Sequence, residues 1–371
     1  MSGAMRIGLF FWSLELGGVE HMMVELARAL VERGHSVTLI LARAARPDEY
    51  LPDPRIGIVR LGCATTPRTI LKLAVHLSSL RYDLLYTAMP TTNIAAIAAI
   101  SLARVPTKLV ISERSNPVLE ARHAPTWRYR AAFTLQPFVY PLADAIVAVS
   151  AGLADALAKS ARLSRDTIRV IYNPAFCDDA GNKDRPALHP WLLDKDRPVI
   201  LAAGRLMAQK DFATLIRAFA LVRAQRPARL IILGEGPERP RLEALLDELG
   251  LESDVAMPGY RSDIRPFLAE ADVFALTSIW EGFGNVLVEA LGAGCSIVST
   301  DCPDGPAEIL ADGRYGTLVA VGDEAGLCSA LIRALDRPFD PQEQRQRARH
   351  FSVARSADAY ETLFQHLVGA R

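Results

Sequence analysis

Residues 6–41 of this chain read RIGLFFWSLELGGVEHMMVELARALVERGHSVTLIL. The opening apolar run predicts a short buried strand, and it leads into the pair Gly17-Gly18. In 19–33 the apolar residues recur at helical spacing, and Gly34 stands where a glycine commonly ends a helix. The closing run, rich in Val, Ile, Leu and Thr, predicts a second strand. A strand, a glycine turn, a helix and a strand in this order predict a βαβ unit, and therefore a parallel sheet.

The same alternation of strand and helix continues along the chain and restarts after a polar stretch at 176–197. The strands predicted beyond the first unit lie at 84–86, 108–111, 145–149, 168–171, 199–204, 230–234, 255–257, 273–276 and 296–299. We therefore predict an α/β protein with two Rossmann-like, doubly wound domains: residues 1–175, joined by a C-terminal helix at 352–371, and residues 176–351. Because ligands of such sheets bind beyond the carboxyl ends of the strands, we expect the active site in a cleft between the domains.

Composition is that of a globular protein, with half of the 371 residues hydrophobic and 23% charged. The net charge of zero hides an asymmetry. Residues 1–175 hold 20 Lys and Arg against 13 Asp and Glu, while the remainder holds 22 against 29. A basic first half favours an anionic partner such as a membrane surface or a phosphate-bearing substrate, although chance fluctuation is the alternative. No nucleic-acid partner is predicted.

The five cysteines form no CxxC pair, so we expect neither a disulfide framework nor a cysteine metal site, as in a reducing cytosol. The first residues do not resemble a signal peptide, and no apolar run approaches the roughly 18 residues that span a bilayer. These features predict a cytoplasmic protein that is soluble or lies on the inner face of a membrane.

The strongest functional motif is the segment 278–290, which reads SIWEGFGNVLVEA and joins a predicted strand to a predicted helix. Gly282 and Gly284 allow backbone N–H groups to approach a ligand, and the helix N-terminus favours an anion such as phosphate. Glu281 and Glu289 flank this turn and can accept hydrogen bonds from sugar hydroxyls. The alternative is a glycine turn with solvated glutamates.

A second motif, Gly204–Asp211, also follows a predicted strand. Arg205, with a planar fork of donors, and Lys210, a point charge, can both bind a diphosphate. Two ordinary surface cations are the alternative. The sequence shows no acidic cluster typical of a metal site, so we expect these cations to take the place of Mg²⁺ and predict no metal or other cofactor.

Three further segments are ambiguous. The Ser112–Pro117 segment follows a strand, where Glu113 and Arg114 are candidates for contact with an acceptor or for helix capping. The aromatic and basic stretch Trp127–Tyr140 fits a lipid interface or an ordinary amphipathic helix. The segment Gly234–Gly236 begins like a dinucleotide fingerprint but lacks the third glycine, so we do not expect NAD binding.

Together these motifs resemble the retaining GT-B glycosyltransferases of family 4. Glu281 and Glu289 match the E-x7-E motif of that family, and Arg205 with Lys210 matches its Arg–Lys pair. Further matches are the N-terminal glycine loop at 17–20, the late loop at 305–309 and Asn173-Pro174 at the interdomain junction. The resemblance covers nearly the whole chain, in order. Many members carry a histidine after the strand at 108–111, where this chain reads Ser-Glu-Arg, and in this it resembles the subgroup that builds bacterial surface glycans on polyprenyl diphosphate.

The resemblance implies a GT-B fold and metal-independent transfer with retention, by front-side attack in which the leaving phosphate helps to take the acceptor proton. Arg205 and Lys210 are implied to bind the donor diphosphate, Glu289 the ribose and Glu281 the transferred sugar. The implied acceptor side holds Gly17, Glu113 and Arg114, and the remaining donor-site residues implied are Gly18, Tyr260, Arg261, Phe283, Gly284, Asn285 and Val286.

The function expected is therefore sugar transfer from a nucleotide sugar, UDP-N-acetylhexosamine or UDP-hexose, to a lipid-linked saccharide. Two alternatives stay open at this point: a nucleotide-sugar 2-epimerase on the same fold, and a non-catalytic nucleotide-sugar-binding protein.

Overall fold

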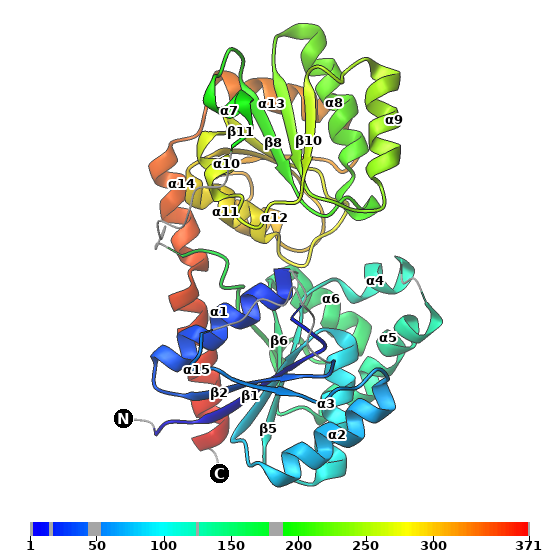
Figure 1. The fold of residues 1–371 in the computed structure, drawn as a ribbon, viewed down its shortest axis with the longest axis vertical. Coiled ribbons are helices and arrows are strands. Elements are labelled where there is room, and N and C mark those ends of the chain that lie inside the picture. The colour runs from blue at the N-terminus through cyan, green and yellow to red at the C-terminus, as the bar shows by residue number, and fades with distance from the viewer. Residues whose placement is uncertain (1–2, 15–17, 44–52, 124–125, 178–187, 370–371) are drawn as a thin grey trace. The chain divides into compact units, whose positions relative to one another are not determined.

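The structure is a computed structural model, and it describes residues 3–14, 18–43, 53–123, 126–177 and 188–369. The chain divides into two compact units. Unit 1 holds residues 1–174 together with 353–371, and unit 2 holds residues 175–352. Each unit is an α/β layer structure built around one parallel sheet (Figure 1).

Unit 1 has a seven-stranded sheet in the order β3-β2-β1-β4-β5-β6-β7. All of its neighbouring strands pair in parallel. The strands are β1 (Arg6–Phe11), β2 (Ser36–Leu41), β3 (Gly57–Arg60), β4 (Leu84–Ala88), β5 (Lys108–Glu113), β6 (Ala145–Ala148) and β7 (Ile168–Val170). The order reverses between β1 and β4, which is the topological switch point of a doubly wound sheet.

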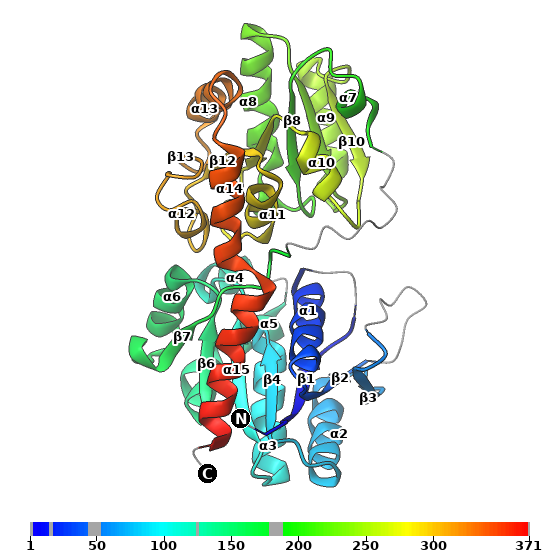
Figure 2. The same cartoon turned by 90° about the vertical axis from the view of Figure 1, so that its left-hand side faces the viewer.

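Helices cover both faces of this sheet. One face carries α1 (Gly18–Glu32) and α15 (Val353–Gly369), which pack against each other. Figures 1 and 2 show the other helices of unit 1 on the opposite face. These helices are α2 (Thr66–Ser79), α3 (Pro90–Ala103), α4 (Pro117–His123), α5 (Trp127–Val139) and α6 (Ala151–Ala161), with 3₁₀ turns η1 (Tyr140–Leu142) and η2 (Arg165–Thr167).

Unit 2 repeats the plan with a six-stranded parallel sheet in the order β10-β9-β8-β11-β12-β13. Its strands are β8 (Val199–Ala203), β9 (Arg229–Leu233), β10 (Val255–Gly259), β11 (Val273–Leu276), β12 (Ser296–Thr300) and β13 (Thr317–Val319). Its helices are α7 (Pro190–Leu193), α8 (Phe212–Gln225), α9 (Arg239–Leu249), α10 (Arg265–Glu270), α11 (Asn285–Ala293), α12 (Pro306–Ile309), α13 (Glu324–Asp336) and α14 (Pro341–Ala348), with η3 (Ala208–Lys210) and η4 (Arg349–Phe351).

Helix boundaries follow from local capping chemistry. The Ser150 hydroxyl accepts a hydrogen bond from the Leu153 N–H at 3.2 Å, which caps α6. The Asp211 carboxylate does the same for α8 through the Thr214 N–H at 3.3 Å. Gly294, with φ of +82°, ends α11 in the left-handed conformation that glycine adopts without strain.

Helix α15 returns to unit 1 and is held there by charge and by packing. Arg33 forms ion pairs with Asp358 at 2.6 Å and with Glu361 at 3.2 Å. In the interior, the hydroxyl groups of Tyr86 and Tyr360 lie 2.8 Å apart, and Phe364 packs beside both rings. The last helix of the chain thus completes the core of the first unit.

Replacement of Phe364 by Ala tests how much α15 contributes to unit 1. The Phe364 side chain is fully buried, so the change leaves a cavity and is expected to cost about 3–5 kcal/mol of unfolding free energy. Urea unfolding of the whole chain measures the loss. Phe138→Ala is the matched control, since Phe138 is 74% exposed and its removal should change stability little. Equal losses in the two variants would contradict a core role for α15.

Candidate functional site

The four charged residues singled out from the sequence stand at one place in unit 2. Strands β8 and β11 are neighbours at the point where the strand order reverses. Arg205 and Lys210 follow the carboxyl end of β8, whereas Glu281 follows the carboxyl end of β11 and Glu289 lies in α11 just beyond. This switch point is where doubly wound sheets bind their ligands.

Lys210 and Glu281 contact each other directly. The Lys210 Nζ lies 2.5 Å from the Glu281 Oε1, which also accepts a hydrogen bond from the Ser278 hydroxyl at 2.6 Å. Glu281 is only 7% exposed, so its carboxylate needs this cation nearby to offset the lost hydration. The Thr277 hydroxyl donates a hydrogen bond to the Lys210 carbonyl oxygen at 2.9 Å, which holds the backbone at Lys210 against the end of β11.

Close backbone approaches shape the loops of this site. Gly305 has φ of +125°, and a Cβ there would lie 1.9 Å from the Phe283 carbonyl oxygen. A Cβ on Gly234 would likewise meet the Gly204 carbonyl oxygen at 1.9 Å. Only glycine permits these contacts, which bring the loops after β8, β9, β11 and β12 against one another.

Helix α11 directs its N-terminus to the same edge. It begins at Asn285, directly after Gly284, whose φ of +100° lets the chain turn sharply into the helix. Phe283 is buried against Phe351, whereas Asn285 and Val286 are partly exposed in the first turn. The N–H groups of a first helical turn, together with the helix dipole, favour an anion at this position.

Glu289 lies farther along α11, near a charged pair that the sequence did not indicate. Arg265 binds Asp263 at 2.8 Å at the start of α10, and both act on Glu289 through space. Burial raises the pKa of Glu289 to about 7, and the positive Arg265 counteracts part of that rise. The Glu289 carboxyl is therefore poised between its neutral and charged forms near neutral pH.

The remaining predicted donor residues of unit 2 are more exposed. The Arg205 side chain is exposed. Tyr260 is 50% exposed after β10, and the Arg261 guanidinium donates to the Tyr260 carbonyl oxygen at 2.9 Å. Exposed side chains at a binding edge can reorient toward a ligand. The donor-binding roles predicted for Arg205, Tyr260 and Arg261 stay predictions.

In unit 1 the predicted residues fall at the carboxyl ends of β1 and β5. Gly17 lies outside the described residues, and Gly18 is the first residue of α1. Strand β5 extends two residues beyond the predicted strand, so Ser112 and Glu113 pair with β6 instead of starting a loop.

This extension places Glu113 in the interior of unit 1, at 1% exposure. Its Oε1 accepts hydrogen bonds from the amides of Asn93 and Gln136, each at 3.2 Å, and from the Tyr140 hydroxyl. Burial is the largest cause that raises the pKa of Glu113, to about 8. Burial thus favours the neutral carboxyl, and the three donated hydrogen bonds, which favour the charged form, offset only part of the rise in pKa. The same contacts join β5 to α3, α5 and η1, and an acceptor contact for Glu113 stays a prediction.

Arg114 points toward the opposite side of the sheet from Glu113's partners. Its Nη1 donates to the Asn173 side chain at 2.5 Å and its Nη2 to the Tyr86 hydroxyl at 2.6 Å. Because Tyr86 also contacts Tyr360, Arg114 is connected to α15. These partners are all neutral, so none of them compensates the guanidinium charge. Its predicted place on the acceptor side is untested.

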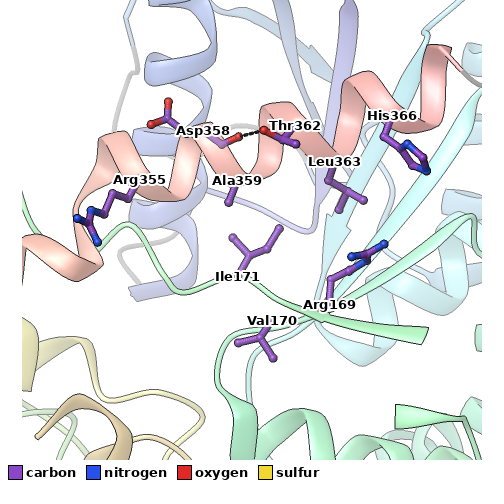
Figure 3. A pocket seen from close by; sticks show the side chains of 9 residues that line it. All are labelled: Arg169, Val170, Ile171, Arg355, Asp358, Ala359, Thr362, Leu363 and His366. Atoms are coloured by element: carbon purple, nitrogen blue, oxygen red, sulfur yellow. Dashed lines mark hydrogen bonds between the residues drawn. The ribbon is translucent and has the colours of Figure 1, made fainter. Parts of the chain in front are cut away.

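Unit 1 also contains a groove of 680 Å³ between β7 and α15 (Figure 3). Ile171 and Leu363 point toward each other across it, with Arg169 and His366 at one end and Arg355 at the other. The acid on its rim, Asp358, is already paired with Arg33. None of the residues predicted for substrate binding lines this groove.

Within the described ranges, no group of three or more His, Cys, Asp or Glu side chains is arranged to hold a metal ion. The same part of the chain has no helix that is both long enough and apolar enough to cross a membrane.

Both halves of the chain match known protein families. Residues 16–178 match the family described as Glycosyltransferase Family 4, and residues 197–337 match Glycosyl transferases group 1. The chain belongs to this family of glycosyltransferases.

Individual relatives match this chain over nearly its full length. The chain is 30% identical over 372 residues, 96% of it and 99% of the relative, to N-acetylgalactosamine-N,N'-diacetylbacillosaminyl-diphospho-undecaprenol 4-alpha-N-acetylgalactosaminyltransferase of Campylobacter jejuni. A second Campylobacter jejuni enzyme is 26% identical over 99% of this chain and 100% of its own length, and its name describes N-acetylgalactosaminyl transfer to a glycan on diphospho-undecaprenol. Among solved structures, Anabaena HepE in complex with UDP superposes with a TM-score of 0.75 at 22% identity, over 97% of this chain and 99% of that one. The fold is therefore GT-B.

Several residues that complete the site were missed by the sequence reasoning. Ser278 lay inside the quoted motif without a role, and Arg265 stood outside every motif. Asn173 was noted only as part of a junction. Ser278 lies only three residues from Glu281, so its contact depends on how the loop folds. Arg265 and Asn173 are separated from Glu289 and Arg114 by strands and helices, and no local spacing predicts those contacts.

The Lys210–Glu281 pair can be tested by charge removal. Lys210→Met leaves a buried carboxylate without its cation and is expected to cost about 3–5 kcal/mol of unfolding free energy. The double variant Lys210→Met with Glu281→Gln removes both charges and should recover most of that loss in urea unfolding. A control, Lys195→Met, breaks an exposed pair with Asp272 at 3.7 Å and should have little effect. A double variant no more stable than Lys210→Met would show that the pair is not coupled.

Glu113 predicts a pH dependence of stability. Its pKa is about 8 in the folded protein against an ordinary value of 4.5, so the unfolded chain releases this proton first as the pH rises. The contribution of Glu113 to stability is therefore complete below pH 4.5 and is lost as the pH rises through about 8. In Glu113→Gln the urea midpoint should depend less on pH over this interval. In Glu25→Gln, which removes a pair with Arg28, the midpoint should follow that of the wild type. Parallel curves for wild type and Glu113→Gln would mean that the carboxyl is charged at neutral pH.

Proposed function

We propose that this glycosyltransferase moves a sugar from a nucleotide sugar, UDP-N-acetylhexosamine or UDP-hexose, to a polyprenyl-diphosphate-linked saccharide in bacterial surface glycan synthesis. The observation that carries the proposal is the convergence of Arg205, Lys210, Glu281 and Glu289 at one switch point. The Campylobacter relatives support the acceptor and the N-acetylhexosamine, since both are named for N-acetylgalactosaminyl transfer to undecaprenol-linked glycans.

Each charged residue has a distinct task in this proposal. Lys210 has three N–H donors, so it can keep its bond to Glu281 and still donate to a phosphate oxygen. Arg205 presents a planar fork that matches two oxygens of the same diphosphate. The Glu281–Lys210 pair then bridges the two ends of the donor, with the sugar hydroxyls at the carboxylate and the diphosphate at the ammonium. Glu289 accepts hydrogen bonds from the ribose.

The reaction breaks the bond between the anomeric carbon and the oxygen of the β-phosphate and forms a bond from that carbon to the acceptor oxygen. We propose that the new bond forms on the same face, so that the configuration is retained, and that the acceptor proton passes to the leaving phosphate oxygen. The developing charge on the diphosphate is stabilised by Arg205, by Lys210 and by the N-terminus of α11. We propose that these groups suffice without a metal ion, at the cytoplasmic face of the membrane that holds the acceptor.

Arg205→Ala is the cleanest test, because the exposed side chain can be removed without disturbing the core. We expect a fall in kcat/KM of about 10²–10³-fold with unchanged stability, and a comparable loss in Glu289→Ala. Arg241→Ala, an exposed arginine in α9 that is 70% accessible, is the matched control and should retain full activity. Assays run with a chelator, and product anomers analysed by NMR, test metal independence and retention at the same time.

Donor binding is measured separately by thermal shift with UDP-, GDP- and ADP-sugars, since a ligand of the native state raises the unfolding midpoint. A UDP-sugar should shift the wild type and Arg241→Ala but not Arg205→Ala. Full activity in Arg205→Ala, or no shift with any nucleotide sugar, would overturn the assignment of the site.

A further inference from the structure

Three helices of unit 1 share an unusual charge pattern. Helices α2, α3 and α5 contain no Asp or Glu, although the chain as a whole has 42 acidic residues among 371. They come from three separate parts of the sequence. A typical exposed helix of unit 2, α9, carries Glu243, Asp247 and Glu248 on its surface. Helix α8 of unit 2 also lacks acids, but its neighbours α9 and α13 carry them, whereas in unit 1 three acid-free helices pack together.

The three helices form one layer. Helix α3 packs between α2 and α5, and Figures 1 and 2 show α2 and α3 side by side on the face of the sheet opposite α15. We call these three helices the acid-free layer. Because α3 is apolar nearly all round, the layer presents no strongly polar ridge at its centre.

Large apolar side chains are exposed on every helix of the acid-free layer. On α2, Leu71 is 58% and Val75 70% exposed, and on α3 Leu102 is 54% exposed. On α5, Leu135 is 45% and Phe138 74% exposed. Leu71, Val75 and Leu102 also line a shallow groove of 460 Å³ between α2 and α3. Such a concentration of apolar groups on a surface marks a binding face.

The charges among these apolar groups are positive. Arg68 and Lys72 are exposed on α2, and Arg130 is exposed on α5. Arg81 and Arg104 are exposed just after the ends of α2 and α3. The nearby acid Asp144 is paired with Lys108 at 2.8 Å. Every charged side chain on the three helices themselves is basic, and apolar and basic side chains together are complementary to anionic lipid headgroups above an acyl layer.

We propose that the acid-free layer is the surface by which this enzyme docks on an anionic membrane, with the exposed apolar side chains entering the headgroup region and the basic side chains contacting lipid phosphates. A second copy of the chain fits poorly, because two such layers would bring like charges together without acids between them. The strands run along the layer, and α3 begins just after β4 ends. The carboxyl edge with Arg114 therefore stands at one end of the docked face.

This inference deepens the proposed function and rests on it for the membrane-held acceptor. Binding is tested by sedimentation of the whole chain with vesicles of phosphatidylcholine alone or mixed with phosphatidylglycerol. The wild type should sediment with the anionic vesicles, and less so at high salt. Leu135→Glu and Val75→Glu should each lower the vesicle–water partition coefficient about tenfold. Each change removes apolar surface that would enter the membrane and adds a negative charge that the anionic lipids repel.

Leu221→Glu is the matched control. Leu221 lies on α8 of unit 2 and is 42% exposed, close to the 45% of Leu135, and the substitution adds the same charge. It should sediment like the wild type. Transfer to an acceptor held in vesicles should fall in Leu135→Glu, while transfer to a water-soluble acceptor analogue should be unchanged in every variant.

The outcomes separate the docking surface from the proposed function. Equal vesicle binding by Leu135→Glu, Leu221→Glu and wild type would overturn the docking surface even if transfer is normal. A wild-type dimer that Leu135→Glu converts to monomer, without vesicle binding, would overturn it in favour of a protein interface. If vesicle binding depends on the acid-free layer but no lipid-linked acceptor receives sugar, the docking surface is supported and the proposed acceptor is refuted.

Discussion

Parallel strand pairing is the constraint on which the chemistry of this chain depends. In a parallel sheet every strand ends at the same edge, so residues far apart in sequence are brought together if each follows a strand. Lys210 and Glu281 are 71 residues apart, yet β8 and β11 are adjacent and the two side chains meet at 2.5 Å. In unit 1 the same rule brings Arg114, after β5, to the Tyr86 hydroxyl on β4.

This constraint explains why much of the fold could be predicted from sequence. Buried parallel strands read as continuous apolar runs, and the predicted runs at 199–204 and 273–276 coincide with β8 and β11. The helix predicted at the end of the 278–290 motif is α11, with glycines at both ends. Strands β3 and β13 escaped prediction because they lie at sheet edges and are short and partly exposed, so neither shows a continuous apolar run.

The contacts within the site could be predicted less well, for a physical reason. A motif specifies which residues lie near a strand end, but the direction of a side chain there depends on how far the strand continues. The strand at 108–111 was expected to stop before Ser112, whereas β5 runs to Glu113. Pairing with β6 for two further residues turns Glu113 inward to Asn93, Gln136 and Tyr140, and leaves Arg114 as the first residue beyond the sheet.

The two units differ in how they treat charge, and that difference fits a division of labour. In unit 2 the acids are placed against cations, as Glu281 is against Lys210, and these charges converge on the switch point. In unit 1 three packed helices, α2, α3 and α5, lack acids, and Arg114 has neutral partners. A compensated site suits a small soluble donor, because its cations are held in place before the donor arrives. An uncompensated positive surface instead acts at longer range and suits an extended anionic partner, for which accumulation at the surface matters more than a single fixed contact. The charge asymmetry of +7 in residues 1–175 and −7 in the remainder agrees with this proposed division.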